Sequence, residues 1–133
     1  MLCVPHSISV EVADTRVAVG LFADLFDGLT HERLCLAFLN RHARLLGLRL
    51  MSDASASAVD LPLPRIFEEA FRLRASGLIV AHNHPSGDPE PSAADRAATR
   101  RLADVARALD FHLIDHLIFA GDRVSSFRAL GLL

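Results

Sequence analysis

The chain has 133 residues, 51% of them hydrophobic and 23% charged, and this length and balance predict one globular domain rather than a disordered chain. Its 16 acidic residues outnumber 14 basic ones, and the formal net charge of −2 argues against a nucleic-acid binder driven by bulk charge. The sequence has no Cys-x-x-Cys pair, signal peptide or apolar run long enough to span a membrane, so a cytoplasmic location is expected.

Helical and extended patterns alternate along the chain. The first 14 residues are expected to form a flexible or peripheral segment. Residues 52–58 are predicted to be a loop that leads to a short extended piece at 59–61. Hydrophobic periodicity predicts helices at about 15–27, 64–75 and 92–109, and strands at about 34–39, 44–51, 78–80, 111–120 and 124–127. Such interleaving predicts an α/β fold, with a mixed central sheet flanked by helices.

Two histidines follow the apolar run at 78–80. If that strand continues, His82 and His84 leave the same face of it, because side chains two apart in a strand point the same way. The proline-rich stretch after them must turn, and a helical pattern that begins at Ser92 can bring Asp95 back beside the histidines. Two imidazoles and one carboxylate leave a fourth position for water, which is the layout of a catalytic zinc site. We therefore expect one Zn²⁺ per chain.

Each part of this pattern also has an ordinary explanation. Ser92 and Asp95 form a common helix-capping pair, and a His-x-His sequence at a strand end is often incidental. Taken together, however, the spacing H-x-H-x7-S-x-x-D resembles the signature of the JAB/MPN/JAMM metalloprotease family. The string His-Asn-His-Pro-Ser-Gly-Asp at 82–88 and the sequence Asp-His-Leu-Ile at 115–118 resemble its RadC branch. The resemblance covers about 30–133, and it implies an MPN-type fold, with 1–133 as a single domain.

The family signature also contains an upstream glutamate. Glu32 is the candidate general base because it stands just before the predicted strand at 34–39. A solvated acid at a strand end is the alternative interpretation. Glu11, Glu68 and Glu69 compete for the role, but they lie before the first helix or on the second. The resemblance further implies that Ser92 hydrogen-bonds the oxyanion of the reaction while it caps its helix.

Other polar residues have weaker claims to the site. On a strand, Asp115 and His116 face opposite ways, so at most one of them can be the partner of a zinc-bound imidazole. A hydrogen-bonded structural pair is the favoured interpretation for both. His31 and His42 are expected to be exposed, and Asp88 to form a turn rather than to bind the metal.

Two functions follow from these patterns. The first is a zinc-dependent hydrolase, a protease or isopeptidase that cleaves peptide or isopeptide bonds with metal-activated water. The second is a non-catalytic RadC-like interaction module tied to DNA repair or replication. The sequence identifies neither a peptide or protein substrate nor an oligomeric state, and any binding to nucleic acid is expected to be weak.

Overall fold

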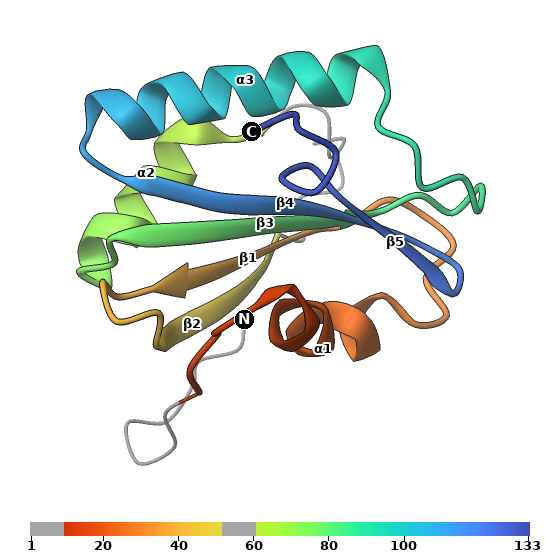
Figure 1. Ribbon diagram of the computed structural model, residues 1–133, viewed down its shortest axis with the longest axis horizontal. Coiled ribbons are helices and arrows are strands. Elements are labelled where there is room, and N and C mark those ends of the chain that lie inside the picture. The colour runs from red at the N-terminus through yellow and green to blue at the C-terminus, as the bar shows by residue number, and fades with distance from the viewer. Residues whose placement is uncertain (1–9, 52–60) are drawn as a thin grey trace.

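A five-stranded mixed sheet with helices on both faces forms the framework of the computed structural model, which describes residues 10–51 and 61–133 (Figure 1). The strand order is β2-β1-β3-β4-β5. The predicted α/β fold is confirmed, and it is consistent with the MPN type. In chain order the elements are α1 (Thr15–Phe26), β1 (Leu34–Leu39), β2 (Leu45–Met51), α2 (Leu63–Arg72), β3 (Gly77–Asn83), α3 (Ala93–Ala108), β4 (His112–Ala120) and β5 (Arg123–Ser126).

The strands are antiparallel except at the centre of the sheet. β1 pairs antiparallel with β2 and with β3, whereas β3 and β4 are parallel. A parallel pair needs a long crossover between its strands, and the segment that contains α3 supplies it. β5 returns antiparallel to β4 through a tight turn at Gly121, where φ is +61°. This order places the end of β3 and the start of α3 at one end of the sheet.

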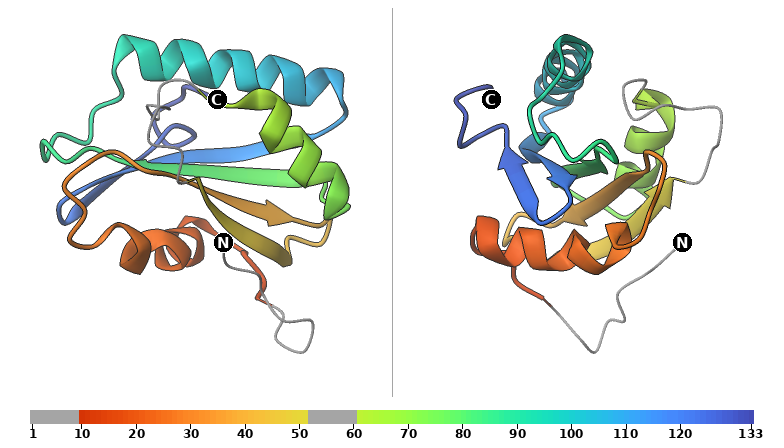
Figure 2. Two further views of the ribbon diagram at one scale, coloured as in Figure 1. Left: turned by 180° about the vertical axis from the view of Figure 1, so that it is seen from behind. Right: turned by 90° about the vertical axis from the view of Figure 1, so that its right-hand side faces the viewer.

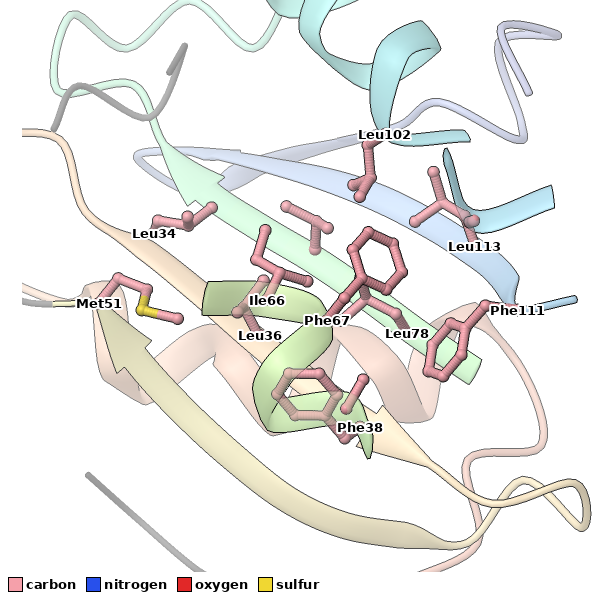
Figure 3. Close-up of a cluster of buried hydrophobic side chains, with 13 residues drawn as sticks. Leu34, Leu36, Phe38, Met51, Ile66, Phe67, Leu78, Leu102, Phe111 and Leu113 are labelled. Atoms are coloured by element: carbon pink, nitrogen blue, oxygen red, sulfur yellow. The ribbon is translucent and has the colours of Figure 1, made fainter. Parts of the chain in front are cut away.

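Helices α2 and α3 cover one face of the sheet and α1 covers the other (Figures 1 and 2). Alternate residues of β1 supply the two cores. Leu34, Leu36 and Phe38 pack with α2 and α3 (Figure 3), while Cys35, Ala37 and Leu39 pack with α1. Because both faces are buried, β1 is a continuous apolar run, which is why its bounds were predictable from sequence.

A β-bulge interrupts β4 beside β3. Leu78 pairs with Leu113, but Ile79 pairs with Asp115, so one extra residue lies in β4 between them. An extra residue reverses the direction in which every later side chain of a strand points. As a result His116, rather than Asp115, lies on the face that α3 covers.

The helix ends follow local chemistry. The carboxylate of Asp14 caps α1 by accepting a hydrogen bond from the Val17 backbone N–H at 3.0 Å. The prediction that the second helix runs to about Ala75 was wrong. α2 ends at Arg72 because Arg74 takes a left-handed φ of 55°, and Gly77 already begins β3.

Some predictions fall wholly or partly outside the described residues. These are the loop at 52–58, most of the extended piece at 59–61, and positions 1–9 of the peripheral segment. Val10 and Val12 exchange backbone hydrogen bonds with Leu45 and Ala43, so the chain just before α1 runs beside the start of β2. Within the two described ranges, no helix is long and apolar enough to cross a membrane.

Candidate metal centre

Three side chains converge where β3 ends and α3 begins. His82 and His84 leave the same face of the chain, and Asp95 reaches them from the first turn of α3. The two histidine Nε2 atoms lie 3.0 Å apart. Nε2 of His84 is 3.2 Å from Oδ2 of Asp95, and Nε2 of His82 is 3.6 Å from Oδ1. The predicted cluster therefore forms.

These separations fit a small tetrahedral ion. Zinc binds imidazole and carboxylate at about 2.0–2.2 Å, which places neighbouring ligand atoms of a tetrahedron about 3.3–3.5 Å apart. The three observed distances, 3.0, 3.2 and 3.6 Å, bracket that value. Three residues fill three positions and leave a fourth for a water or a substrate atom.

A chain of hydrogen bonds fixes which nitrogen of His82 carries the proton. Thr99 donates its hydroxyl proton to the Asp95 carbonyl at 2.8 Å, so its oxygen must accept from Nδ1–H of His116, 2.7 Å away. Burial holds the pKa of His116 well below its usual range, so the ring is neutral and its Nε2 can only accept. That atom lies 2.7 Å from Nδ1 of His82, which must donate. Nε2 of His82 therefore presents a lone pair to the cluster.

His84 is oriented in the same way by its own loop. Its Nδ1 lies 2.8 Å from the backbone carbonyl of Asp88, which can only accept, so Nδ1 carries the proton and Nε2 is left as an acceptor. Arg123 and Ser125 of β5 hold this loop through hydrogen bonds to the carbonyls of Gly87 and Pro89. Two acceptor nitrogens only 3.0 Å apart repel each other unless a cation lies beside them.

Asp95 combines two tasks. Its carboxylate accepts from the Ser92 backbone N–H at 2.9 Å, and its own N–H donates to the Ser92 hydroxyl at 3.0 Å, which is a complete capping box. Burial raises the pKa of Asp95, the hydrogen bond that its carboxylate accepts from the Ser92 N–H lowers it, and the pKa lies well below its usual range. The group is thus an anion at neutral pH, as a metal ligand must be.

Asp115 has a different use from His116. Its carboxylate accepts from the backbone N–H groups of His116 and Arg128 and from the hydroxyl of Ser126. It therefore fastens the C-terminal segment to β4. Of these two residues, His116 contacts the candidate ligand His82, whereas Asp115 has a structural role in holding neighbouring groups.

Glu32 lies at the same end of the sheet as the cluster. The connection before β1 and the loop after β3 are neighbours there (Figures 1 and 2), and the last β1–β3 pair is Leu34 with His82. Continuing that register by two residues sets Glu32 opposite His84. Its side chain is exposed.

The competing glutamates are used elsewhere. Glu11 forms a bridge with Arg44 at the opposite end of the sheet, and Glu68 is exposed on α2. Glu69 binds the buried guanidinium of Arg49, with Nε to Oε1 at 2.7 Å. Glu32 is thus the candidate whose backbone lies beside the cluster.

The remaining sequence predictions concern exposed groups and turns. His31 and His42 are exposed, as expected. Asp88 accepts a hydrogen bond from the Glu90 N–H at 3.0 Å through its side chain, which is a turn-forming role.

Sequence reasoning missed the roles of Thr99 and Asn83. Thr99 lies one helical turn after Asp95, so the 3.6-residue period offered a signal that both face the sheet. Asn83 stands between the two histidines and points to the other face, where its side chain bonds to the backbone before β1. No spacing in the sequence reveals that contact, because its partners are 50 and 52 positions away.

Comparison with known families accounts for this arrangement. The RadC-like JAB domain family matches residues 12–132 of the chain. The chain belongs to this family. The RadC-like JAB domain begins just before α1, so it includes every element described above.

Curated relatives agree with the match. A UPF0758 protein of Symbiobacterium thermophilum is 33% identical over 93% of this chain and 53% of its own length. A UPF0758 protein of Vibrio cholerae is 37% identical over 74% of the chain and 62% of its own length. The UPF0758 protein YfjY of Escherichia coli is 35% identical over 80% of the chain and 66% of its own length. The chain thus spans roughly half to two thirds of these relatives, and their names state no activity.

Proposed function

We propose that this RadC-like JAB domain is a zinc-dependent metallohydrolase that cleaves peptide or isopeptide bonds. The observation that carries the proposal is the convergence of three proton-free ligand atoms, Nε2 of His82, Nε2 of His84 and the carboxylate of Asp95. Hydrogen bonds set both histidine tautomers for metal binding. A bound zinc lowers the pKa of water to about 7 and polarises a carbonyl oxygen.

The chain's own residues supply the proton transfers. In the proposed reaction Glu32 accepts a proton from the attacking water as the new carbon–oxygen bond forms. It then donates that proton to the leaving nitrogen as the carbon–nitrogen bond breaks, so the carboxylate is regenerated. Its exposed position, two residues before the Leu34–His82 pair at the end of the sheet that carries the cluster, suits a group that must exchange protons with substrate.

Ser92 is proposed to stabilise the oxyanion. Its capping role uses an oxygen lone pair, because the hydroxyl accepts the Asp95 N–H at 3.0 Å. The hydroxyl proton therefore remains free to donate toward a developing negative charge. The helix cap and the oxyanion donor are compatible in one side chain.

The test compares Glu32→Gln with wild-type protein, using Glu68→Gln on the exposed side of α2 as the matched control. Glu32→Gln is expected to keep stoichiometric zinc and to lower the rate of hydrolysis about 10²–10⁴-fold. Zinc content and cleavage of a peptide and isopeptide library are measured on the zinc-loaded proteins.

The outcomes separate the parts of the proposal. Full activity in Glu32→Gln assigns the base to another residue, and loss of zinc makes Glu32 a ligand instead. If zinc-loaded wild-type protein cleaves no member of the library, hydrolysis of peptide bonds is contradicted and the interaction module tied to DNA repair takes its place.

A further inference from the structure

The side-chain amide of Asn83 ties the end of β3 to the segment before β1. Its Oδ1 accepts a hydrogen bond from the Arg33 backbone N–H at 2.6 Å, and its Nδ2 donates to the His31 backbone carbonyl at 3.0 Å. Asn83 is only 5% exposed, so these bonds form away from competing water. The two partners are the residues on either side of Glu32.

These bonds take over where backbone pairing ends. The ladder between β1 and β3 finishes at Leu34 and His82. One step further along the register, Arg33 lies opposite Asn83, and the side-chain amide replaces the missing backbone partner. An amide is well suited to this, because it carries both an acceptor and a donor. The backbone on both sides of Glu32 is therefore held.

We propose that Asn83 is a positioning residue that holds Glu32 beside the metal centre. The inference rests on the proposed role of Glu32 as the base. Asn83 is not a candidate ligand, since residues two apart share a face and Asn83 lies between His82 and His84. Its side chain can be changed while all three candidate ligands stay in place.

The expected effect follows from the cost of misplacing a catalytic group. A displacement of about 1 Å can lower a rate about 10²-fold. Asn83→Ala removes both bonds and is expected to lower kcat about 10- to 100-fold with little change in KM. Asn83→Asp keeps the acceptor for Arg33 but loses the donor for His31, so it should fall between wild type and Asn83→Ala.

The first measurement is a double-mutant cycle on the zinc-loaded protein with Asn83→Ala, Glu32→Gln and both together. If Asn83 acts through Glu32, Asn83→Ala slows wild-type protein but costs nothing further in the Glu32→Gln background. Asn40→Ala is the matched control, because the Asn40 side chain also accepts backbone N–H groups, those of His42 and Arg44, at the opposite end of the sheet. Equal slowing by Asn83→Ala in both backgrounds overturns the proposal.

The second measurement needs no substrate. The pH midpoint of the visible spectrum is recorded for the Co²⁺-loaded variants, because a carboxylate next to the ion opposes the loss of a proton there. Glu32→Gln and Asn83→Ala are both expected to lower the midpoint, Asn83→Ala by no more than Glu32→Gln, and the double variant is expected to lower it no further than Glu32→Gln does. A wild-type midpoint in Glu32→Gln contradicts the proposed base. A shifted midpoint in Glu32→Gln with a wild-type midpoint in Asn83→Ala contradicts only the role of Asn83.

Folding of the variants is checked by circular dichroism and by zinc content. If Asn83→Ala does not fold, Asn83→Asp replaces it in both measurements. Aspartate has nearly the same shape as asparagine and still accepts a hydrogen bond from the Arg33 N–H. An Asn83→Asp protein with the wild-type rate and midpoint would then refute the role of the His31 contact.

Discussion

Nε2 of His116 lies 2.7 Å from Nδ1 of His82, and the His116 ring stacks on Phe127 with centroids 4.5 Å apart. His116 is thus held on one side by a hydrogen bond to a candidate ligand and on the other by an aromatic face. The Thr99 hydroxyl, 2.7 Å from Nδ1, completes the restraint. The three side chains that restrain the His116 ring in this way, those of His82, Phe127 and Thr99, are all buried, so the orientation of the His116 ring depends on groups shielded from solvent.

The ligand set predicts one zinc per chain. His84→Ala is expected to abolish stoichiometric zinc binding, because two remaining ligands hold the ion far more weakly. His82→Ala should do the same and should also lose activity. Zinc is counted by elemental analysis of protein purified without added metal. His42→Ala, an exposed histidine at the other end of the sheet, is the control. Retention of zinc at wild-type affinity in His84→Ala would show that the ligand assignment is wrong.

Thr99 is predicted to tune metal affinity without touching the metal. Thr99→Val keeps the side-chain shape but removes the acceptor for Nδ1–H of His116. Without that acceptor, the hydrogen bond between His116 and His82 no longer fixes the proton of His82 on Nδ1. Loss of such a supporting group typically weakens metal binding about 10- to 100-fold. Competition with a zinc chelator measures the affinity. Thr30→Val, at an exposed threonine, should bind zinc as wild type does. Unchanged zinc affinity in Thr99→Val would show that the hydrogen bonds from Thr99 through His116 to His82 do not support metal binding.

Glu69 predicts an acid-dependent part of the stability. The hydrogen bond from Arg72 lowers the pKa of Glu69, burial raises it, and the hydrogen bond and charge of Arg49 lower it further, so the pKa lies below its ordinary value. A lowered folded-state pKa gives stability that is present above the unfolded pKa and is lost as pH falls through the folded one. Glu69→Gln should therefore cost about 2 kcal/mol at neutral pH, and the difference from wild type should shrink in acid.

Urea unfolding at several pH values measures this difference. Glu68→Gln, next to it and exposed, is the control and should change stability little at any pH. A cost for Glu69→Gln that is independent of pH would mean that packing, rather than charge, explains the contact with Arg49.

Arginines of α3 predict only weak nucleic-acid binding. Arg96, Arg100 and Arg107 line a groove of about 620 Å³ with Arg128, but Asp104 and Asp110 line it too. Since the whole chain carries a formal charge of −2, binding to duplex DNA should be weaker than micromolar at physiological salt and should fall steeply as salt rises. Titration with labelled duplex at two salt concentrations measures it. Submicromolar binding at physiological salt would favour the repair module over the hydrolase.

Local patterns made most of the fold predictable. β1 was predicted with its observed bounds because six buried apolar residues form one run. The ligands were predictable for a similar reason, since His82, His84 and Asp95 are close in sequence and a strand and a helix cap fix their directions. The end of α2 was not predictable, because the residue with a left-handed backbone conformation there is Arg74 rather than the glycine that usually ends a helix in this way.

Contacts between distant segments could not be read in this way. The side of the sheet to which His116 points depends on the bulge between Leu113 and Asp115, and one inserted residue leaves no mark in the hydrophobic pattern. The bonds from Asn83 to the residues around Glu32 depend on how β1 and β3 are paired. Both features exist only after the sheet has formed.

The capping box at Ser92 and Asp95 has a consequence for the order of folding. The metal ligands are joined by a short stretch of chain, from the end of β3 to the first turn of α3, and loops of about ten residues close within about 10–100 ns. Glu32 instead needs the non-local pairing of β1 with β3, a slower kind of event. We expect zinc to be captured by a partly folded chain, so that the ion is in place before the base arrives. Stopped-flow refolding should therefore accelerate with added zinc in wild-type protein and not in His84→Ala.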